Sequence, residues 1–219
     1  MNLEFFKIQS QGNDYLFFDL RNKAIPEDLG KLSKKISDRH FGVGADGIVL
    51  ILDDTKSNAF MRIFNADGSE AKMCGSALMS STQYLANDLN KNKITINTNS
   101  GKKTGYVSKD HFVTVNMGQP EFNKNELTIG SFTGNVVQIG NPHFVTFLPD
   151  LEENLAKEYG PQIEANKNFP GGINIEFAKI ISRKLIEIQI WERGSGATLA
   201  CGTGSCAAVF AGISKGSLD

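Results

Sequence analysis

Nearly the same order of chemical groups occurs twice along this chain, and the two copies keep their spacing. Asn13 matches Asn141 at an offset of 128 residues, and Cys74 matches Cys201 at an offset of 127. A repeat of this length predicts two similar halves, each large enough to own a core. It also predicts that each half contributes one thiol.

Each of these cysteines opens the same three-residue step, in which glycine and then a hydroxyl residue follow the thiol. Residues 74–76 read Cys-Gly-Ser, and residues 201–203 read Cys-Gly-Thr. Asn65, nine residues before the first cysteine, corresponds to Glu192, nine residues before the second. Two such thiols facing each other across a cleft would form a matched acid and base.

The composition excludes several classes of partner. The chain has 219 residues, 40% of them hydrophobic and 21% charged, with a net charge of -1. This is typical of a soluble globular protein, and two domains are expected, at residues 1–118 and 119–219. Without a basic excess, nucleic acid is not an expected partner. A membrane is not expected either, because no apolar run approaches the roughly 20 residues that cross a bilayer.

The cysteines also indicate the compartment. Three cysteines, an odd number without metal-type spacing, favour a reducing compartment over a disulfide framework. The first residues lack the basic head and the cleavage site of a signal peptide. We therefore expect a cytoplasmic protein with free thiols and no metal site.

Apolar periodicity predicts an α+β fold whose elements follow a similar order in both halves. The expected strands of the first half are 3–9, 15–19, 48–52, 59–64, 94–98, 104–107 and 112–117, with helices at 29–36 and from about 75 to 90. The expected strands of the second half are 136–139, 144–147, 173–180 and 185–191, with a short helix near 151–159. A last helix follows Cys201. It is apolar on nearly every side, so it is expected to be buried.

This arrangement places Cys74 and Cys201 at helix N-termini. There the positive end of the helix dipole and unpaired backbone N–H groups favour a thiolate, which acts as a base. The same N–H groups bind carboxylates, and the following glycines let a ligand approach them closely. A lone cysteine is more often a small buried hydrophobe, and Cys206 keeps that interpretation. For the two repeated cysteines, the matched spacing favours catalysis.

Further polar residues flank both thiols: four asparagines, an acidic and basic pair, and one histidine. Each asparagine alone fits an ordinary turn and needs no further role. Together the groups exceed what turns require and suit a zwitterionic, highly polar ligand. The histidine is either a surface imidazole or a group that tunes a thiol. The residues are Asn13, Asn65, Asn141, Asn174, Glu192, Arg193 and His143.

Five stretches of the chain resemble diaminopimelate epimerase. They are residues 11–15 (Gln-Gly-Asn-Asp-Tyr), 64–71 with 73–75, 140–143 (Gly-Asn-Pro-His), 191–194 (Trp-Glu-Arg-Gly) and 200–204 (Ala-Cys-Gly-Thr-Gly). The resemblance spans essentially the whole chain. It implies two pseudo-symmetric domains, each a mixed or antiparallel sheet wrapped round a central helix. It also implies cofactor-independent conversion of LL-2,6-diaminopimelate to the meso form, in lysine and cell-wall biosynthesis.

The resemblance further implies residue roles. Cys74 and Cys201 would be the base and acid pair, and Glu192 would meet the reacting amine of the substrate, a small-molecule amino acid. Backbone amides for the reacting carboxylate would come from Gly75, Ser76, Gly202 and Thr203. The remaining pocket would be lined by Asn13, Asn65, Asn141, Asn174 and Arg193.

Some features depart from the family pattern. Ser76 stands where the family usually has Asn, Met79 where it has Arg, and Ala197 where it has Glu. Family members also usually continue past Asp219 with strands that cover the second domain. We therefore expect the apolar helix at 206–213 either to be covered by another subunit, as in a homodimer, or to leave the chain less stable than a longer version.

The residues leave two other functions open. One is another cofactor-free racemase of the same fold, acting on an amino acid such as proline or histidine. The other is a binding or vestigial protein that keeps both cysteines without turnover. A cofactor-free assay on LL-diaminopimelate separates the three functions.

Overall fold

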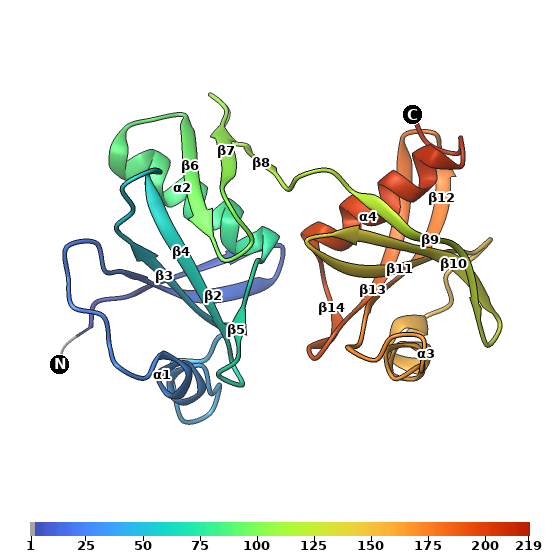
Figure 1. Cartoon of the computed structure of the whole chain (residues 1–219), viewed down its shortest axis with the longest axis horizontal. Coiled ribbons are helices and arrows are strands. Elements are labelled where there is room, and N and C mark those ends of the chain that lie inside the picture. Colours follow the sequence, from blue (N-terminus) through green and yellow to red (C-terminus); the bar gives the residue numbers. More distant parts are fainter. Residues whose placement is uncertain (1–2) are drawn as a thin grey trace. The chain divides into compact units, whose positions relative to one another are not determined.

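The computed structural model describes residues 3–219. The chain divides into two compact units, Met1–Asn116 and Met117–Asp219. In each unit a sheet packs against two helices (Figure 1). The α+β architecture expected from the sequence is confirmed.

The first unit contains an eight-stranded sheet in the order β1-β2-β3-β4-β6-β7-β8, with β5 paired to β4. β2 is parallel to β3 and β4 is parallel to β6, whereas the other neighbours are antiparallel. The strands are β1 (Phe6–Ser10), β2 (Asn13–Asp19), β3 (Gly47–Leu52), β4 (Ala59–Asn65), β5 (Glu70–Ala71), β6 (Lys93–Thr98), β7 (Lys103–Val107) and β8 (Val113–Asn116). The helices are α1 (Leu29–Ile36) and α2 (Gly75–Leu89).

Both faces of this sheet are covered by helices. The central strand β3 reads Gly-Ile-Val-Leu-Ile-Leu and is buried along its whole length. Because side chains alternate between the two faces, Ile48 and Leu50 share one face, where they form a core with Leu29 of α1. α2 packs against β1 at one edge of the sheet and against β6, β7 and β8 at the other. The sheet therefore wraps round α2.

The second unit contains a six-stranded sheet in the order β14-β13-β12-β11-β10-β9. β11 is parallel to β12, and the other neighbours are antiparallel. The strands are β9 (Glu121–Ile129), β10 (Phe132–Ile139), β11 (Asn141–Phe147), β12 (Asn174–Ser182), β13 (Leu185–Glu192) and β14 (Gly196–Thr198). The helices are α3 (Leu155–Glu164) and α4 (Gly202–Ser214).

The second sheet also has two apolar faces. Phe144 and Phe177 form a core with Ile163 of α3 on one face. Val145 lies in a separate core with Ala208 of α4 on the other. α4 packs against β10, β11, β12 and β13. The small side chains on its inner face let the helix approach the sheet closely.

The two units share the same order of strands and helices, as the repeat in the sequence predicts. The run β1-β2-α1-β3-β4-β5-α2 corresponds to β10-β11-α3-β12-β13-β14-α4, with the same parallel step after the first helix of each run. β2 and β11 each have seven residues, half-buried at the first two and the last and buried between them. The repeat therefore aligns residues of the two units strand by strand.

The expected elements need correction in two respects. The helix expected near 151–159 begins at Leu155 and continues to Glu164, because Gly160 packs closely on the Trp191 ring and Ile163 enters the core. The short strands β5 and β14 and the polar strand β9 were not expected from the sequence. All three owe their structure to pairing with a neighbouring strand rather than to an apolar pattern.

The expectation that the last helix is buried on nearly every side is wrong. Val209 is 37% exposed and Ile213 is 47% exposed, whereas Ala207 and Ala211 are fully buried. The physical reason is that the strands cover only one side of α4. Across residues 3–219, no helix is both long and apolar enough to span a membrane.

We predict that the two central helices respond differently to loss of an apolar side chain. Leu78→Ala removes a fully buried side chain from α2 and is expected to lower the free energy of unfolding by about 2–5 kcal/mol. Ile213→Ala trims a half-exposed side chain of α4 and is expected to cost about 1 kcal/mol or less. Urea unfolding of the full chain measures both. Equal costs would show that the outer face of α4 is packed in solution.

Candidate functional site

Cys74 is the N-cap of α2, in extended backbone conformation with φ -146° and ψ 125°. Its sulfur lies 3.1 Å from the Ser76 Oγ, and the Tyr15 hydroxyl donates to it at 3.6 Å. The Asn13 amide donates to the same sulfur at 3.7 Å. The sulfur thus has three neutral polar neighbours from two elements, β2 and the start of α2.

Asn13 begins β2 and connects that strand to the cysteine helix. Its Nδ2 donates to the Ser76 Oγ at 2.9 Å. Its Oδ1 is buried, and within residues 3–219 it has no hydrogen-bond partner. Because a buried acceptor without a donor is costly, this oxygen suits an ammonium or amide group of a ligand.

A charged network fixes the backbone next to Asn13. Lys7 and Arg39 form ion pairs with Asp14 at 2.8 Å and 2.6 Å. Arg39 also pairs with Asp46 at 2.8 Å, which ties the loop before β3 to the start of β2. Burial opposes ionisation of Asp14, but hydrogen bonds from Arg39 and Lys7 outweigh it and hold the pKa of that carboxyl well below its usual range.

Cys201 is the N-cap of α4, with φ -132° and ψ 116°, a backbone conformation close to that of Cys74. Its sulfur accepts a hydrogen bond from the Gly204 N–H at 3.4 Å and lies 3.3 Å from the Thr203 Oγ1. Cys201 is buried. In both units, then, the hydroxyl two residues after the cysteine contacts the cysteine sulfur.

Two carboxylates lie near Cys201. Burial, followed by the negative charges of Glu192 and Glu176, raises the pKa of the Cys201 thiol far above its ordinary value. Burial likewise raises the pKa of Glu192, although hydrogen bonds with Thr198 and Cys201 oppose that shift. The Thr198 hydroxyl donates to the Glu192 carboxylate at 2.7 Å. Cys201 therefore favours the protonated thiol, which can act as an acid.

A buried histidine–glutamate pair lies next to the first turn of α4. His143 and Glu176 are fully buried, and the His143 Nδ1 lies 2.7 Å from a Glu176 oxygen. The other ring nitrogen lies 3.1 Å from the Asn141 Oδ1. Gly204 packs directly on the Glu176 carboxylate, because a Cβ at that position would overlap it. His143 is thus a buried member of the site's polar network and not a surface imidazole.

The other expected residues lie at or just beyond the ends of strands: Asn65 ends β4, Asn174 begins β12 and Arg193 follows β13. Asn174 is buried, its Nδ2 donates to the Pro142 carbonyl, and its Oδ1 accepts the Arg193 N–H, each at 3.0 Å. The Arg193 side chain is exposed and donates to the Gly171 carbonyl at 3.0 Å. In the first unit, the Asn65 amide donates to the Ser69 hydroxyl at 3.0 Å, within its own turn.

The four residues expected to offer backbone amides occupy the first turns of the two helices. An α-helix leaves its first N–H groups without an intrahelical acceptor, so these groups are available to an anion. Gly75 and Ser76 begin α2, and Gly202 and Thr203 begin α4. By contrast, Cys206 lies inside α4, and burial raises the pKa of its thiol.

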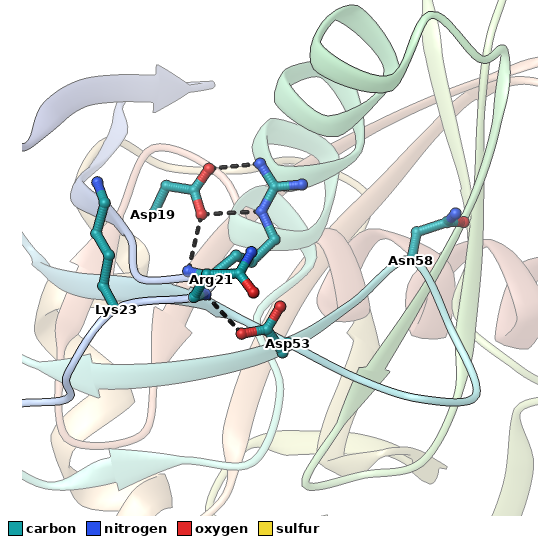
Figure 2. A pocket seen from close by; sticks show the side chains of 6 residues that line it. Asp19, Arg21, Lys23, Asp53 and Asn58 are labelled. Atoms are coloured by element: carbon teal, nitrogen blue, oxygen red, sulfur yellow. Dashed lines mark hydrogen bonds and ion pairs between the residues drawn. The ribbon is translucent and has the colours of Figure 1, made fainter.

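An open cavity of about 360 Å³ lies at the other end of β2 from Asn13. Figure 2 shows the Asp19 carboxylate paired with Arg21 in the lining of this cavity, where Asp53 accepts the Asn22 N–H at 2.7 Å. Arg21 also pairs with Asp88 at 2.8 Å, so its guanidinium is already engaged by two carboxylates. Because β2 has seven residues that rise about 3.3 Å each, this cavity is separate from the Cys74 site.

Two neighbours of the thiols were missed in the sequence. The Tyr15 hydroxyl donates to the Cys74 sulfur. Glu176 contacts His143, and its negative charge raises the pKa of the Cys201 thiol. A signal was present for each. Glu176 is a charged residue between the apolar Ile175 and Phe177, and Tyr15 occupies the position that matches His143 at the offset of 128. Among residues 3–219, no three His, Cys, Asp or Glu side chains gather as a metal site would require.

Sequence comparison gives one consistent result. The family model described as diaminopimelate epimerase matches residues 5–123 and 135–219. A diaminopimelate epimerase of Pelotomaculum thermopropionicum is 38% identical over 237 residues, covering 98% of this chain and 85% of that protein. One of Methanococcus maripaludis is 36% identical over 236 residues, with coverage of 98% and 85%.

Comparison with solved structures identifies the same fold in distant proteins. A predicted epimerase from Pseudomonas aeruginosa has a TM-score of 0.71 at 13% identity, covering 98% of this chain and 83% of that one. A hydroxyproline epimerase from Agrobacterium vitis has a TM-score of 0.68 at 12% identity, with coverage of 99% and 78%. At such low identity these likenesses establish the fold alone.

We predict that Glu192→Gln makes Cys201 more reactive. Burial raises the pKa of the Cys201 thiol most, and the Glu192 charge raises it further, so the neutral amide should lower that pKa and increase the thiolate fraction at a given pH. The alkylation rate of Cys201 at pH 8, followed by peptide mass spectrometry, is expected to rise up to about tenfold. Glu187→Gln, an exposed change on the same strand, is the matched control. An unchanged rate in Glu192→Gln would exclude this electrostatic account.

Proposed function

The chain belongs to the diaminopimelate epimerase family, and we propose that it converts LL-2,6-diaminopimelate to the meso isomer without a cofactor. The observation that carries this proposal is that each unit presents a cysteine as the N-cap of a helix, at matching positions of a repeated topology. We place this activity in the cytoplasm, in the biosynthesis of lysine and of cell-wall precursors.

Inversion of a carbon requires that its proton leave from one face and that another proton arrive on the opposite face. In the proposed reaction, the thiolate of one cysteine takes the α-proton and becomes a thiol. The thiol of the other cysteine gives its proton to the carbanion and becomes a thiolate. No electrons are exchanged, and the reverse reaction interchanges the two roles. A thiol pair supplies both the base and the acid, so the proposed reaction needs no cofactor.

The charge that develops on the substrate must be stabilised, because the α-proton of an amino acid is weakly acidic. We propose that the first-turn amides of the two helices, at Gly75, Ser76, Gly202 and Thr203, bind the reacting carboxylate. Such fixed dipoles need no reorganisation as the negative charge forms. Glu192, half-buried beside Cys201, is the proposed partner of the reacting ammonium.

The distal amino-acid head of diaminopimelate needs polar partners away from the reacting carbon. Arg193 suits its carboxylate, because the guanidinium is exposed and is steadied by the Gly171 carbonyl. The buried Asn13 Oδ1 suits an ammonium donor. Asn65, Asn141 and Asn174 are proposed to complete the pocket. In the structure, side chains or carbonyls of the protein already hold each of these three amides, so they present a rigid lining.

We predict that Cys74→Ser and Cys201→Ser each lower the rate of epimerisation by about 100-fold or more, because a hydroxyl is a far weaker acid than a thiol and the remaining thiol serves only one face. The assay follows conversion of LL-diaminopimelate and incorporation of solvent deuterium at the α-carbon. Cys206→Ala, a change away from both helix starts, is the control and should keep its turnover. Full inversion by either serine variant would overturn the two-thiol proposal. Turnover of proline in place of diaminopimelate would show that the proposed substrate is wrong.

We also predict that Arg193→Ala weakens substrate binding more than folding. Loss of a charged hydrogen bond to the distal carboxylate is expected to raise KM about tenfold or more. The melting temperature should change little, because the side chain is exposed. Arg183→Ala, which removes another exposed arginine of the same unit, is the control. An unchanged KM together with a lower melting temperature would make Arg193 a structural residue instead.

A further inference from the structure

Tyr15 is the one ionisable side chain that donates a hydrogen bond to Cys74 among the bonds found in residues 3–219. It is the third residue of β2 and is only 6% exposed. Its hydroxyl donates to the Cys74 sulfur at 3.6 Å. Hydrogen bonds to a charged acceptor are stronger than those to a neutral one, so this contact favours the thiolate over the thiol.

The internal repeat gives Tyr15 a counterpart. His143 is the third residue of β11, as Tyr15 is of β2, and the two strands are buried in the same pattern. In the parallel ladders, Tyr15 lies opposite Gly47 and His143 lies opposite Asn174. Two residues further along the partner strands stand Val49 in the first unit and Glu176 in the second. A His-Glu pair in one unit is therefore matched by a Tyr-Val pair in the other.

This difference makes the surroundings of the two thiols chemically unequal. Near Cys74 the polar groups are a phenol, an amide and a hydroxyl, all of them neutral. Near Cys201 they include the carboxylates of Glu192 and Glu176, and the Cys201 thiol is more deeply buried. Neutral donors stabilise a thiolate, whereas buried carboxylates oppose one.

We propose that Tyr15 is a positioning residue whose hydroxyl holds the Cys74 sulfur and stabilises the thiolate that Cys74 forms as the base of the proposed reaction. The proposal rests on the two-thiol function above and concerns the one thiol that Tyr15 contacts. Tyr15 acts through Cys74 and needs no contact with substrate.

The test is the pH dependence of thiol alkylation in the full chain, with Tyr15→Phe as the variant. Phenylalanine keeps the buried ring and deletes only the hydroxyl. Iodoacetamide is the probe, and peptide mass spectrometry separates Cys74 from the other two cysteines. The midpoint of the Cys74 profile is expected to move up by about one pH unit, while that of Cys201 stays in place. Tyr84→Phe is the matched control, because the Tyr84 hydroxyl donates to Asp19 at the far end of β2.

A second variant keeps the test valid if the Tyr15→Phe chain does not fold. Tyr15 replaced by 3-fluorotyrosine keeps its shape and becomes a stronger donor, so the Cys74 midpoint is expected to fall. A midpoint that moves in neither variant overturns the proposal, even where epimerisation is intact. Opposite shifts in the two variants support it. Opposite shifts in a chain that fails to epimerise diaminopimelate would support the role of Tyr15 as a donor and would overturn the proposed function instead.

Discussion

The packing of one helix inside a curved sheet is the constraint on which each unit depends. α2 reaches from β1 to β8 of its sheet, and α4 lies along β10–β13 of the other. A helix held in this way has its start fixed by the surrounding strands, so a residue at its N-cap becomes a rigid group. In both units that residue is a cysteine in extended conformation, next to free backbone amides. The chemistry is therefore positioned by the cores rather than by the loops.

Duplication supplies two thiols in similar backbone settings, and divergence makes them different. In each Cys-Gly-hydroxyl sequence, the side-chain oxygen of the third residue contacts the cysteine sulfur. The distance is 3.1 Å for Ser76 and 3.3 Å for Thr203. The strands beneath then diverge, since β12 carries a buried carboxylate where β3 carries valine. An acid and a base working on one carbon need opposite protonation states, so equal surroundings would serve this reaction poorly.

Much of this organisation could be predicted from the sequence, for definable reasons. Helix α2 and the apolar strands follow from periodicity, and the asparagine at the start of β2 follows from the repeat. β9 is largely polar and β14 has three residues, so their pairing is tertiary and leaves little trace in the local pattern. The contact of Tyr15 with Cys74 joins residues 59 positions apart and likewise depends on the fold. Exposure of Ile213 could not be predicted, because composition does not reveal which side of a helix a sheet covers.

The close approach of Gly204 to Glu176 links two positions in the evolution of the chain. Any side chain at residue 204 would overlap the buried carboxylate, and that carboxylate is in turn held by His143. A mutational path that replaces this glycine must therefore first shorten or remove the acid, which would leave the buried imidazole without its partner. The three residues are expected to vary as a set, so sequences that have lost one member should have lost the others as well.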